Sequence, residues 1–476
     1  LILLLAPTLW AQPDSEPSTP EAVIQQIETA LLPKVRVVGR DVAPATLQER
    51  MAFHGVPAVS IAVIDQGKIA WAKAYGLADV EAGRAATTET LFQSASMSKP
   101  VATMTALQLV QDGLLELDGP INESLASWQL PASAFTAEQP VTLRHLMTHT
   151  AGTTVSGFPG YAATDSVPTT MQVLDGESPA NTQAVRSFAK PGHSFRYSGG
   201  GMTIMQLAMA DVTETSFVEL TRERMLGPAG MERSTYAQPL PAARALEAAT
   251  AYDSDGTPIA GRYHTYPEMA AAGLWTTPTE YAGWILTVNE AVAGASDAVL
   301  SQALTDSMLT PNSNGWGLGM PVNGTGDALA FMHGGSNAGY KCQMVGYPHR
   351  GQGAVVMTNS DTGSALVDEL MTALHDAYDW PIFAPTVVTP VSLDETTLKA
   401  IAGTYQQFGN TDIPIRLEEG KLIVYPPGIT PRELVPISDT QIVDIVDGEH
   451  LTIERDEEGT ITGIKASWTT LKRVSE

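Results

Sequence analysis

Two groups of strand-like segments, one near residue 60 and the other beyond residue 328, constrain the fold of this chain most strongly. Residues 58–64 and 69–75 are apolar and β-branched and flank the turn Asp65–Lys68, which predicts a hairpin. The later group consists of the strand-like segments 328–332, 341–347 and 353–359, and a helix is predicted after them, near 364–378. Residues from about 120 to 290 are helix-like and rich in loops. One sheet built from distant parts of the chain, with an inserted helical subdomain, is therefore expected, which is an α+β fold.

A second unit is predicted after residue 385. The stretch Asp379–Thr386 contains two prolines and is typical of a connection between domains. Short β-rich segments then recur every eight to twelve residues or so, a spacing typical of a small antiparallel barrel or sandwich. They are residues 403–406, 413–417, 421–425, 433–437, 441–446, 451–455, 461–464 and 466–471. We therefore expect domains at 21–385 and 386–476.

The beginning of the chain and its charge indicate where the protein acts. Residues 1–11 resemble the end of a secretory signal with a cleavage site after Ala11, although Leu9 is bulkier than usual there. Residues 12–20 form a linker rich in proline and serine, so we expect a secreted or periplasmic protein. No other stretch reaches the roughly 18 apolar residues of a membrane span. The net charge of −25 argues against nucleic acid and anionic membranes as partners.

Ser96 and Lys99 are the first candidates for catalysis. They stand three residues apart at the start of an apolar segment that runs to Gly113, so a helix would place them on one face. A lysine amine can take the serine proton only when it is neutral, a form that burial favours. The same spacing recurs at Ser187 and Lys190, but Pro191 and Gly192 follow at once and stop a helix, so that pair is not expected to be catalytic.

A third polar group is needed to help Lys99 accept the serine proton, and two later segments offer a candidate. Tyr197 stands in a glycine-rich turn before the apolar helix predicted at 202–212, and His333 precedes Gly334 and Gly335 at a loop-like strand edge. Three other patterns are set aside. His145 and His149 lack the glutamate of a zinc helix motif and are expected to be structural. Residues 334–338 miss the Gly-x-Ser-x-Gly pattern of the α/β-hydrolase nucleophile turn by the last residue. The glycines at 315–319 do not form a dinucleotide-binding loop, because no helix pattern follows them. The single cysteine, Cys342, is expected to be a core residue.

The motifs Ser96-x-x-Lys99, Tyr197-Ser198-Gly199 and His333-Gly334-Gly335, in this order, resemble those of the serine β-lactamase and penicillin-binding-protein superfamily. The tyrosine that begins the second motif and the histidine that begins the third resemble the class C-like branch of this superfamily, which includes esterases, D-aminopeptidases and D-alanyl carboxypeptidases. Residues 143–152 and 272–278 also look like that family, and the resemblance covers about 40–380. It implies an antiparallel sheet flanked by helices, while the tail from about 390 resembles a lipocalin-like domain.

The resemblance also implies a role for each site residue. Ser96 would be the nucleophile, with Lys99 and Tyr197 sharing the duties of general base and general acid. His333 would line the site, and the backbone N–H groups of Ser96 and Ser336 would form the oxyanion hole. Gly335, like Gly334, would let substrate approach the bare strand closely. No metal or cofactor is implied.

Two departures from the family pattern bear on the substrate. Gly199 replaces the usual asparagine of the tyrosine motif, and His333 replaces a lysine. Both favour an esterase or peptidase acting on a small ester, amide or peptide. A β-lactamase or D-alanyl-D-alanine carboxypeptidase is the alternative within the class. A non-catalytic penicillin-binding or sensor protein is the alternative from another class, and a homo-oligomer stays open.

Overall fold

The computed structural model describes residues 19–407, 411–427, 429–467 and 469–474. The predicted signal segment 1–11, and nearly all of the linker, lie outside these residues, so both stay predictions. The first helix, α1 (Pro20–Thr29), begins where the Thr19 side chain accepts a hydrogen bond from the N–H of Ala22. In the described part of the chain, every helix is too short or too polar to cross a membrane.

The central sheet has seven antiparallel strands in the order β4-β3-β2-β10-β9-β8-β7, which confirms the predicted union of distant segments. Its strands are β2 (Ala58–Asp65), β3 (Lys68–Asp79), β4 (Arg84–Ala85), β7 (Val322–Asn323), β8 (Ala330–Asn337), β9 (Tyr340–Tyr347) and β10 (Gln352–Thr358). The β2–β3 hairpin turns at Gln66 and Gly67, both with positive φ, as a tight hairpin turn requires. β2 then pairs with β10, which joins the two ends of the domain.

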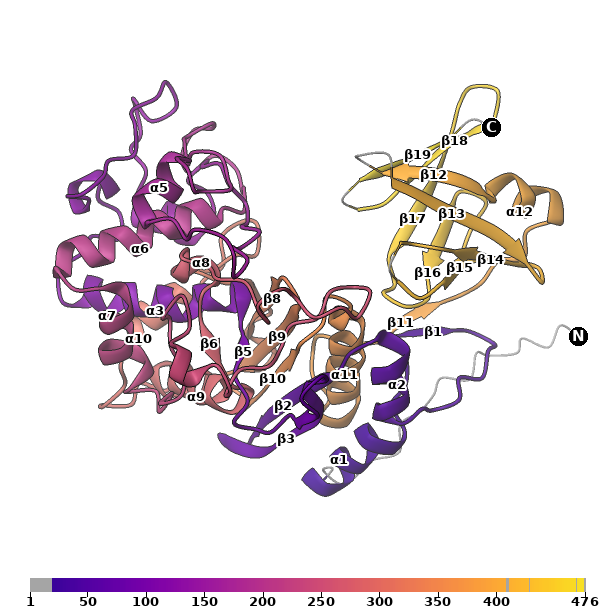
Figure 1. The fold of residues 1–476 in the computed structure, drawn as a ribbon, viewed down its shortest axis with the longest axis horizontal. Coiled ribbons are helices and arrows are strands. Elements are labelled where there is room, and N and C mark those ends of the chain that lie inside the picture. Colours follow the sequence, from indigo (N-terminus) through magenta and orange to yellow (C-terminus); the bar gives the residue numbers. More distant parts are fainter. Residues whose placement is uncertain (1–18, 408–410, 428, 468, 475–476) are drawn as a thin grey trace, which may run out of the picture.

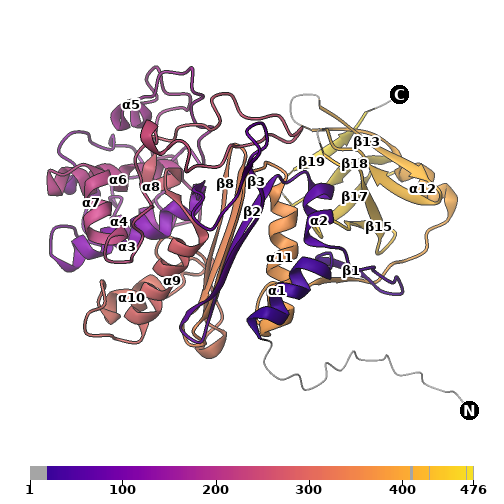
Figure 2. The ribbon, with the colours of Figure 1, turned by 60° about the horizontal axis from the view of Figure 1, so that its bottom comes forward.

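Helices cover both faces of this sheet, as Figure 2 shows with the sheet seen nearly edge-on. Alternate residues of β2 point to opposite faces. Val59, Ile61 and Val63 pack in the cluster that includes residues of α1, α2 and α11, while Ala58 and Ala62 pack in the larger cluster on the other side. Because both faces are covered, β2 shows no alternation of apolar and polar residues, and even its Ser60 is buried. The helices on the first face are α1, α2 (Leu47–His54) and α11 (Gly363–Tyr378).

The helical subdomain lies between β5 and β7 in the sequence, around two buried helices, α3 (Ser98–Gln111) and α6 (Gly199–Thr213). A helix that is apolar on all sides is stable only when it is covered on all sides. The other α-helices of this part are α4 (Leu143–Met147), α5 (Thr170–Asp175), α7 (Phe217–Thr221), α8 (Met269–Ala272), α9 (Pro278–Val292) and α10 (Gln302–Met308). Of these, α9 packs on strands β2, β3 and β10 of the central sheet. The shorter elements are the 3₁₀ turns Ala95–Met97, Ile121–Ser124, Ala242–Arg244 and Gly326–Ala328, the π-helical Arg222–Leu226, and strands β5 (Phe92–Gln93) and β6 (Trp275–Thr276).

The C-terminal part is a closed antiparallel barrel of eight strands in sequence order (Figure 1), which decides between the predicted barrel and sandwich. A short helix, α12 (Glu395–Ile401), packs on it through the Tyr405 hydroxyl, which donates to the Ile401 carbonyl. The strands are β12 (Gly403–Gln407), β13 (Thr411–Glu418), β14 (Lys421–Val424), β15 (Arg432–Pro436), β16 (Gln441–Asp444), β17 (His450–Arg455), β18 (Ile461–Lys465) and β19 (Thr470–Arg473). The barrel is consistent with the lipocalin-like domain expected from the resemblance.

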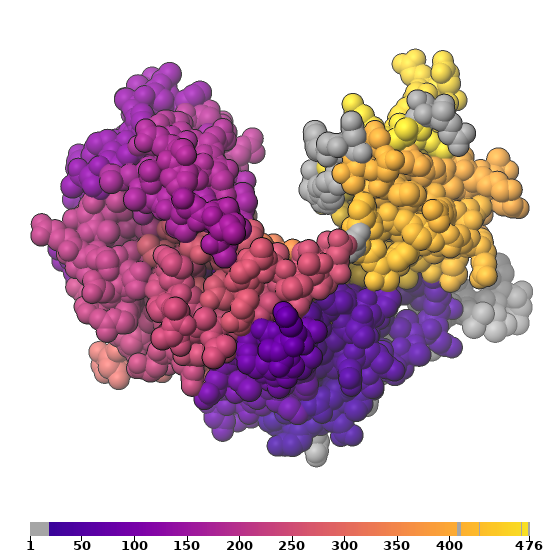
Figure 3. All heavy atoms as spheres, viewed as in Figure 1, coloured from indigo at the N-terminus to yellow at the C-terminus, as the bar shows by residue number. Residues whose placement is uncertain are grey.

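The N-terminal segment connects the barrel to the rest of the molecule. Between α1 and α2 the chain forms β1 (Val35–Val37), which pairs in parallel with β11 (Thr386–Val388). Valines of both strands are buried against Val435 and Val443 of the barrel. The space-filling view shows a deep hollow between the barrel and the helical subdomain (Figure 3).

Candidate active site

Ser96 lies in the 3₁₀ turn Ala95–Met97, which leads directly into α3. The preceding residue, Ala95, is buried and has a φ of +48°, a conformation that L-residues rarely adopt and that turns the chain from β5 into this helix. The Lys99 Nζ atom donates to Ser96 Oγ at 2.8 Å and to the Ala271 carbonyl oxygen of α8 at 2.7 Å. Lys99 is only 2% exposed, so its amine is held in the interior between two uncharged oxygens.

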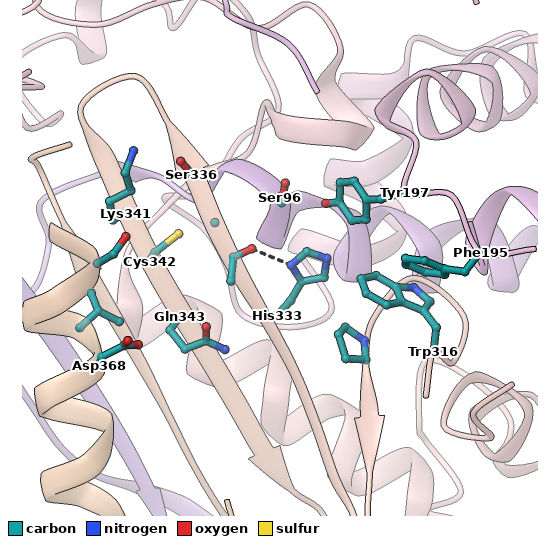
Figure 4. Close-up of a pocket in the computed structure, with 15 residues that line it drawn as sticks. Ser96, Phe195, Tyr197, Trp316, His333, Ser336, Lys341, Cys342, Gln343 and Asp368 are labelled. Carbon is teal, nitrogen blue, oxygen red and sulfur yellow. Dashed lines mark hydrogen bonds between the residues drawn. The ribbon is translucent and has the colours of Figure 1, made fainter. Parts of the chain in front are cut away.

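Tyr197 immediately precedes α6, and the cap of that helix fixes its position. The Ser198 hydroxyl accepts from the Gly201 N–H at 2.9 Å and lies 3.0 Å from the Thr154 carbonyl oxygen, to which it donates. The predicted glycine-rich turn is therefore the first turn of the helix. The Tyr197 ring lies over Lys99, with 4.9 Å between Nζ and the ring centroid, and its hydroxyl points toward Ser96 in Figure 4.

His149 packs against the Tyr197 ring, with 4.3 Å between the ring centroids. Its Nδ1 atom accepts a hydrogen bond from the Ser198 N–H at 3.2 Å, which leaves the proton of the neutral ring on Nε2. Burial and the nearby Lys99 and His333 hold the pKa of His149 well below its usual value. The expected structural histidine is thus a neutral imidazole that packs against the tyrosine ring.

The segment after His333 belongs to β8, which continues to Asn337 instead of ending near residue 332 as the sequence predicted. Gly335 is required there because a Cβ atom would lie 2.3 Å from both the Ser94 carbonyl oxygen and the Cys342 Sγ atom. Cys342 is the expected core residue: its thiol donates to the same carbonyl at 3.2 Å, and burial raises its pKa to about 12. β8 can therefore pass very close to the turn that carries Ser96.

His333 is buried and neutral. Its Nδ1 atom donates to the Gly334 carbonyl oxygen at 2.6 Å, and its Nε2 atom has no hydrogen-bond partner among the described residues. Burial, together with the nearby Lys99, lowers the pKa of His333 to about 3. At neutral pH the site therefore presents an uncharged imidazole where a lysine of the family pattern would present a cation.

Phe158 explains the glycine at position 199. A Cβ atom on Gly199 would lie 2.8 Å from Phe158 Cε2 and 3.3 Å from the Ser156 carbonyl oxygen, which already accepts from the Gly199 N–H at 3.1 Å. The aromatic ring thus occupies the space into which an asparagine side chain would extend. The ring of Phe158 therefore makes the wall apolar beside Gly199.

All seven residues that the sequence singled out line two adjoining cavities. The larger one, of about 500 Å³, is lined by Ser96, Tyr197, His333, Gly335 and Ser336 (Figure 4). The smaller one, of about 110 Å³, shares Ser96, Tyr197 and Ser336 and adds Lys99 and Gly199. Elements more than 200 residues apart in the chain therefore meet at the Ser96 hydroxyl.

Two aromatic residues of the larger cavity were missed by the sequence reasoning. Phe195 and Trp316 lie 5.2 Å apart between ring centroids, and Trp316 is 5.7 Å from both Tyr197 and His333. A usable signal existed for Phe195, because an aromatic residue two positions before Tyr197 would lie on the same side if the segment were extended. Trp316 stands between glycines in a loop, and nothing local indicates that this loop reaches the site.

The second serine–lysine pair and the histidine pair do not form sites. Lys190 is half exposed and pairs with Glu138 at 3.4 Å, and Ser187 lies outside any helix. His145 accepts the backbone N–H that begins α4, whereas His149 lies beyond the end of that helix with a φ of +54°. The two histidines therefore do not share a helical face, and among the described residues no cluster of three or more potential ligands could hold a metal ion.

The sheet with helices on both faces and the buried serine–lysine pair define the class of protein. The beta-lactamase family model matches residues 43–378, and the chain belongs to that family. Protein flp of Staphylococcus aureus (strain MW2) is 23% identical over 342 residues, which are 68% of this chain and 64% of that protein. Esterase EstB of Burkholderia gladioli is 44% identical over 97 residues, 20% of this chain and 24% of that protein. The chain thus spans less than two thirds of these relatives.

Solved structures show the same fold. The octameric penicillin-binding protein homologue from Pyrococcus abyssi aligns with a TM-score of 0.59 and 22% identity, covering 89% of this chain and 98% of that one. The penicillin binding protein from Bacillus halodurans aligns with a TM-score of 0.54 and 20% identity, covering 69% and 98%. The first of these alignments covers nearly the whole chain.

Proposed function

We propose that this protein is a serine hydrolase that cleaves small carboxylic esters through an acyl-enzyme on Ser96. The observation that carries the proposal is the 2.8 Å contact between Lys99 Nζ and Ser96 Oγ, inside a cavity that Tyr197 also lines. Membership of the beta-lactamase family supports the class, and the 97-residue match to a protein named as an esterase supports the substrate.

The proposed reaction needs only groups of this chain, the substrate and water. Ser96 Oγ attacks the ester carbonyl carbon while its proton passes to the Lys99 and Tyr197 pair, and the negative oxygen faces the backbone N–H groups of Ser96 and Ser336. The bond to the alcohol oxygen then breaks, and that oxygen takes the proton. Water attacks the acyl-enzyme in the same way, so that the carboxylic acid leaves and the Ser96 hydroxyl is restored.

Two features favour an ester over a β-lactam or a peptide. Phe158 fills the space of the side-chain amide that position 199 lacks, so this wall offers no hydrogen bond to an amide substrate. The neutral His333 gives no cation to hold a substrate carboxylate on the β8 side. An ester needs less help than an amide because its alcohol is the better leaving group.

The test combines covalent labelling with turnover of nitrophenyl acetate and butyrate. We expect Ser96→Ala to abolish both the fluorophosphonate adduct and turnover, and Lys99→Ala and Tyr197→Phe to lower kcat by about 10²–10⁴-fold. Lys190→Ala is the matched control because it removes the lysine of the second serine–lysine pair, and it should keep wild-type rates. Turnover that survives Ser96→Ala would overturn the proposal.

Intact mass over time separates the hydrolase from a penicillin-binding sensor. A fast rise and decay of an acyl adduct from the nitrophenyl ester supports the proposal. An adduct from labelled penicillin that never decays, together with no ester turnover, would assign the chain to the sensor class. Nitrocefin hydrolysis faster than ester hydrolysis would instead assign it to the β-lactamases.

A further inference from the structure

A third cavity, of about 480 Å³, adjoins the candidate active site and is also lined by Tyr197. We call it the Arg196 cavity; it is lined by residues 153–157, Thr182, Gln183, Phe188, Arg196 and Tyr197. It shares Tyr197 with the larger cavity and Ser156 and Gly157 with the smaller one. A substrate bound at Ser96 can therefore extend into it past the tyrosine.

Among the described residues that line this cavity, Arg196 is the one that carries a charge. Its backbone is fixed, because the Arg196 N–H donates to the His149 carbonyl oxygen at 2.7 Å. Its guanidinium, by contrast, makes no hydrogen bond or ion pair with the described residues. The Arg196 side chain is exposed, so the cavity offers a cation that is available to a ligand.

The charges of the larger cavity are already neutralised. Lys341 pairs with Asp361 at 2.8 Å, and Asp368 pairs with Lys34 at 2.7 Å. An unpaired guanidinium beside the reacting groups therefore distinguishes the Arg196 cavity in a chain whose net charge is −25. The planar fork of an arginine matches the two oxygens of a carboxylate, and a single cation matches its single charge.

We propose that the Arg196 cavity binds a carboxylate on the alcohol part of the substrate, so that the preferred esters are those of hydroxy acids. The proposal rests on the proposed function. Tyr197 separates the two cavities and belongs to the pair that returns a proton to the leaving oxygen. The part of the substrate beyond Tyr197 is therefore the leaving alcohol, and its carboxylate meets Arg196.

The experiment compares 4-acetoxybenzoate with its methyl ester, in which the carboxylate is masked. The quantity measured is the ratio of kcat/KM for the anionic ester to that for the neutral one. Arg196 is exposed, so a charge-assisted contact there should make this ratio fall by about three- to fivefold in Arg196→Gln, equivalent to ~0.7–1 kcal/mol. Arg196→Lys keeps the charge and should restore part of the ratio, which excludes a loss caused by misfolding.

Arg222→Gln is the matched control. Arg222 is exposed, pairs with its neighbour Glu223 and lines none of the three cavities, so the ratio should stay at its wild-type value. A ratio that is the same in Arg196→Gln as in wild type, or that falls equally in Arg222→Gln, would overturn the inference. Failure of the proposed function looks different: neither ester would then be hydrolysed in a manner dependent on Ser96.

Discussion

Glu268 is a buried carboxyl group at the start of α8, and it makes the stability of the protein depend on pH. It directly precedes α8, whose Ala271 carbonyl holds Lys99, and its side chain is fully buried. Neither carboxyl oxygen has a hydrogen-bond partner among the described residues. Burial raises the pKa of Glu268 from 4.5 to about 8.

The magnitude follows from the linkage between proton binding and folding. Below pH 4.5 the carboxyl is protonated in both the folded and the unfolded chain, so folding carries no ionisation penalty. As the pH rises from 4.5 to about 8, the unfolded chain loses this proton while the folded chain keeps it, so the free energy of unfolding falls. At about 1.4 kcal/mol for each pH unit, the loss reaches about 5 kcal/mol and stays constant above pH 8.

Glu268→Gln removes the ionisation and keeps the shape of the side chain. We expect the free energy of unfolding of the variant minus that of wild type to rise by about 4 kcal/mol between pH 5 and pH 8. Urea unfolding followed by tryptophan fluorescence measures it, since Trp275 and Trp284 are buried in the same domain. Other titrating groups cancel in this difference. A difference that does not change with pH would show that the folded carboxyl ionises freely, and would refute the reasoning.

Three further predictions concern single residues. Glu369→Gln should lower the free energy of unfolding by about 3 kcal/mol, because the buried carboxylate pairs with Arg50 and His54; in urea unfolding, a midpoint unchanged from wild type would contradict it. Gly335→Ala should lower both the melting temperature and ester turnover, since the new methyl group would clash with the strand's neighbours. The pKa of His333 is about 3, so between pH 5 and 8 the profile of kcat/KM should have the same shape in His333→Asn as in wild type. A wild-type limb near pH 6.5 that the variant lacks would refute this.

The sequence predicted best those features that are set by neighbouring residues. The β2–β3 hairpin follows from apolar runs around the turn at Gln66 and Gly67. The contact between Ser96 and Lys99 follows from helical spacing alone. The eight barrel strands also follow from local alternation and turns, although only the structure shows that β12 and β19 pair and close the barrel.

The features that the sequence did not predict depend on distant partners. β1 is a three-residue strand that exists because β11, about 350 residues later, lies beside it and both cover barrel valines. β8 continues through two glycines, which have low strand propensity, because β9 pairs with every residue from Phe331 to Asn337. Trp316 enters the site from a loop whose position depends on the whole helical subdomain.

Backbone strain links the two halves of the candidate site. Nine described residues other than glycine have positive φ, and three of them lie at this site: Ala95, His149 and Val155. Ala95 precedes Ser96, His149 supports Tyr197, and the Val155 carbonyl accepts the Gly200 N–H at the start of α6. Each such conformation costs about 1–3 kcal/mol and persists only where surrounding contacts impose it. The valine is the least tolerant of the three because its Cβ is branched. Strain is therefore concentrated where the serine turn and the tyrosine cap must hold fixed positions relative to each other.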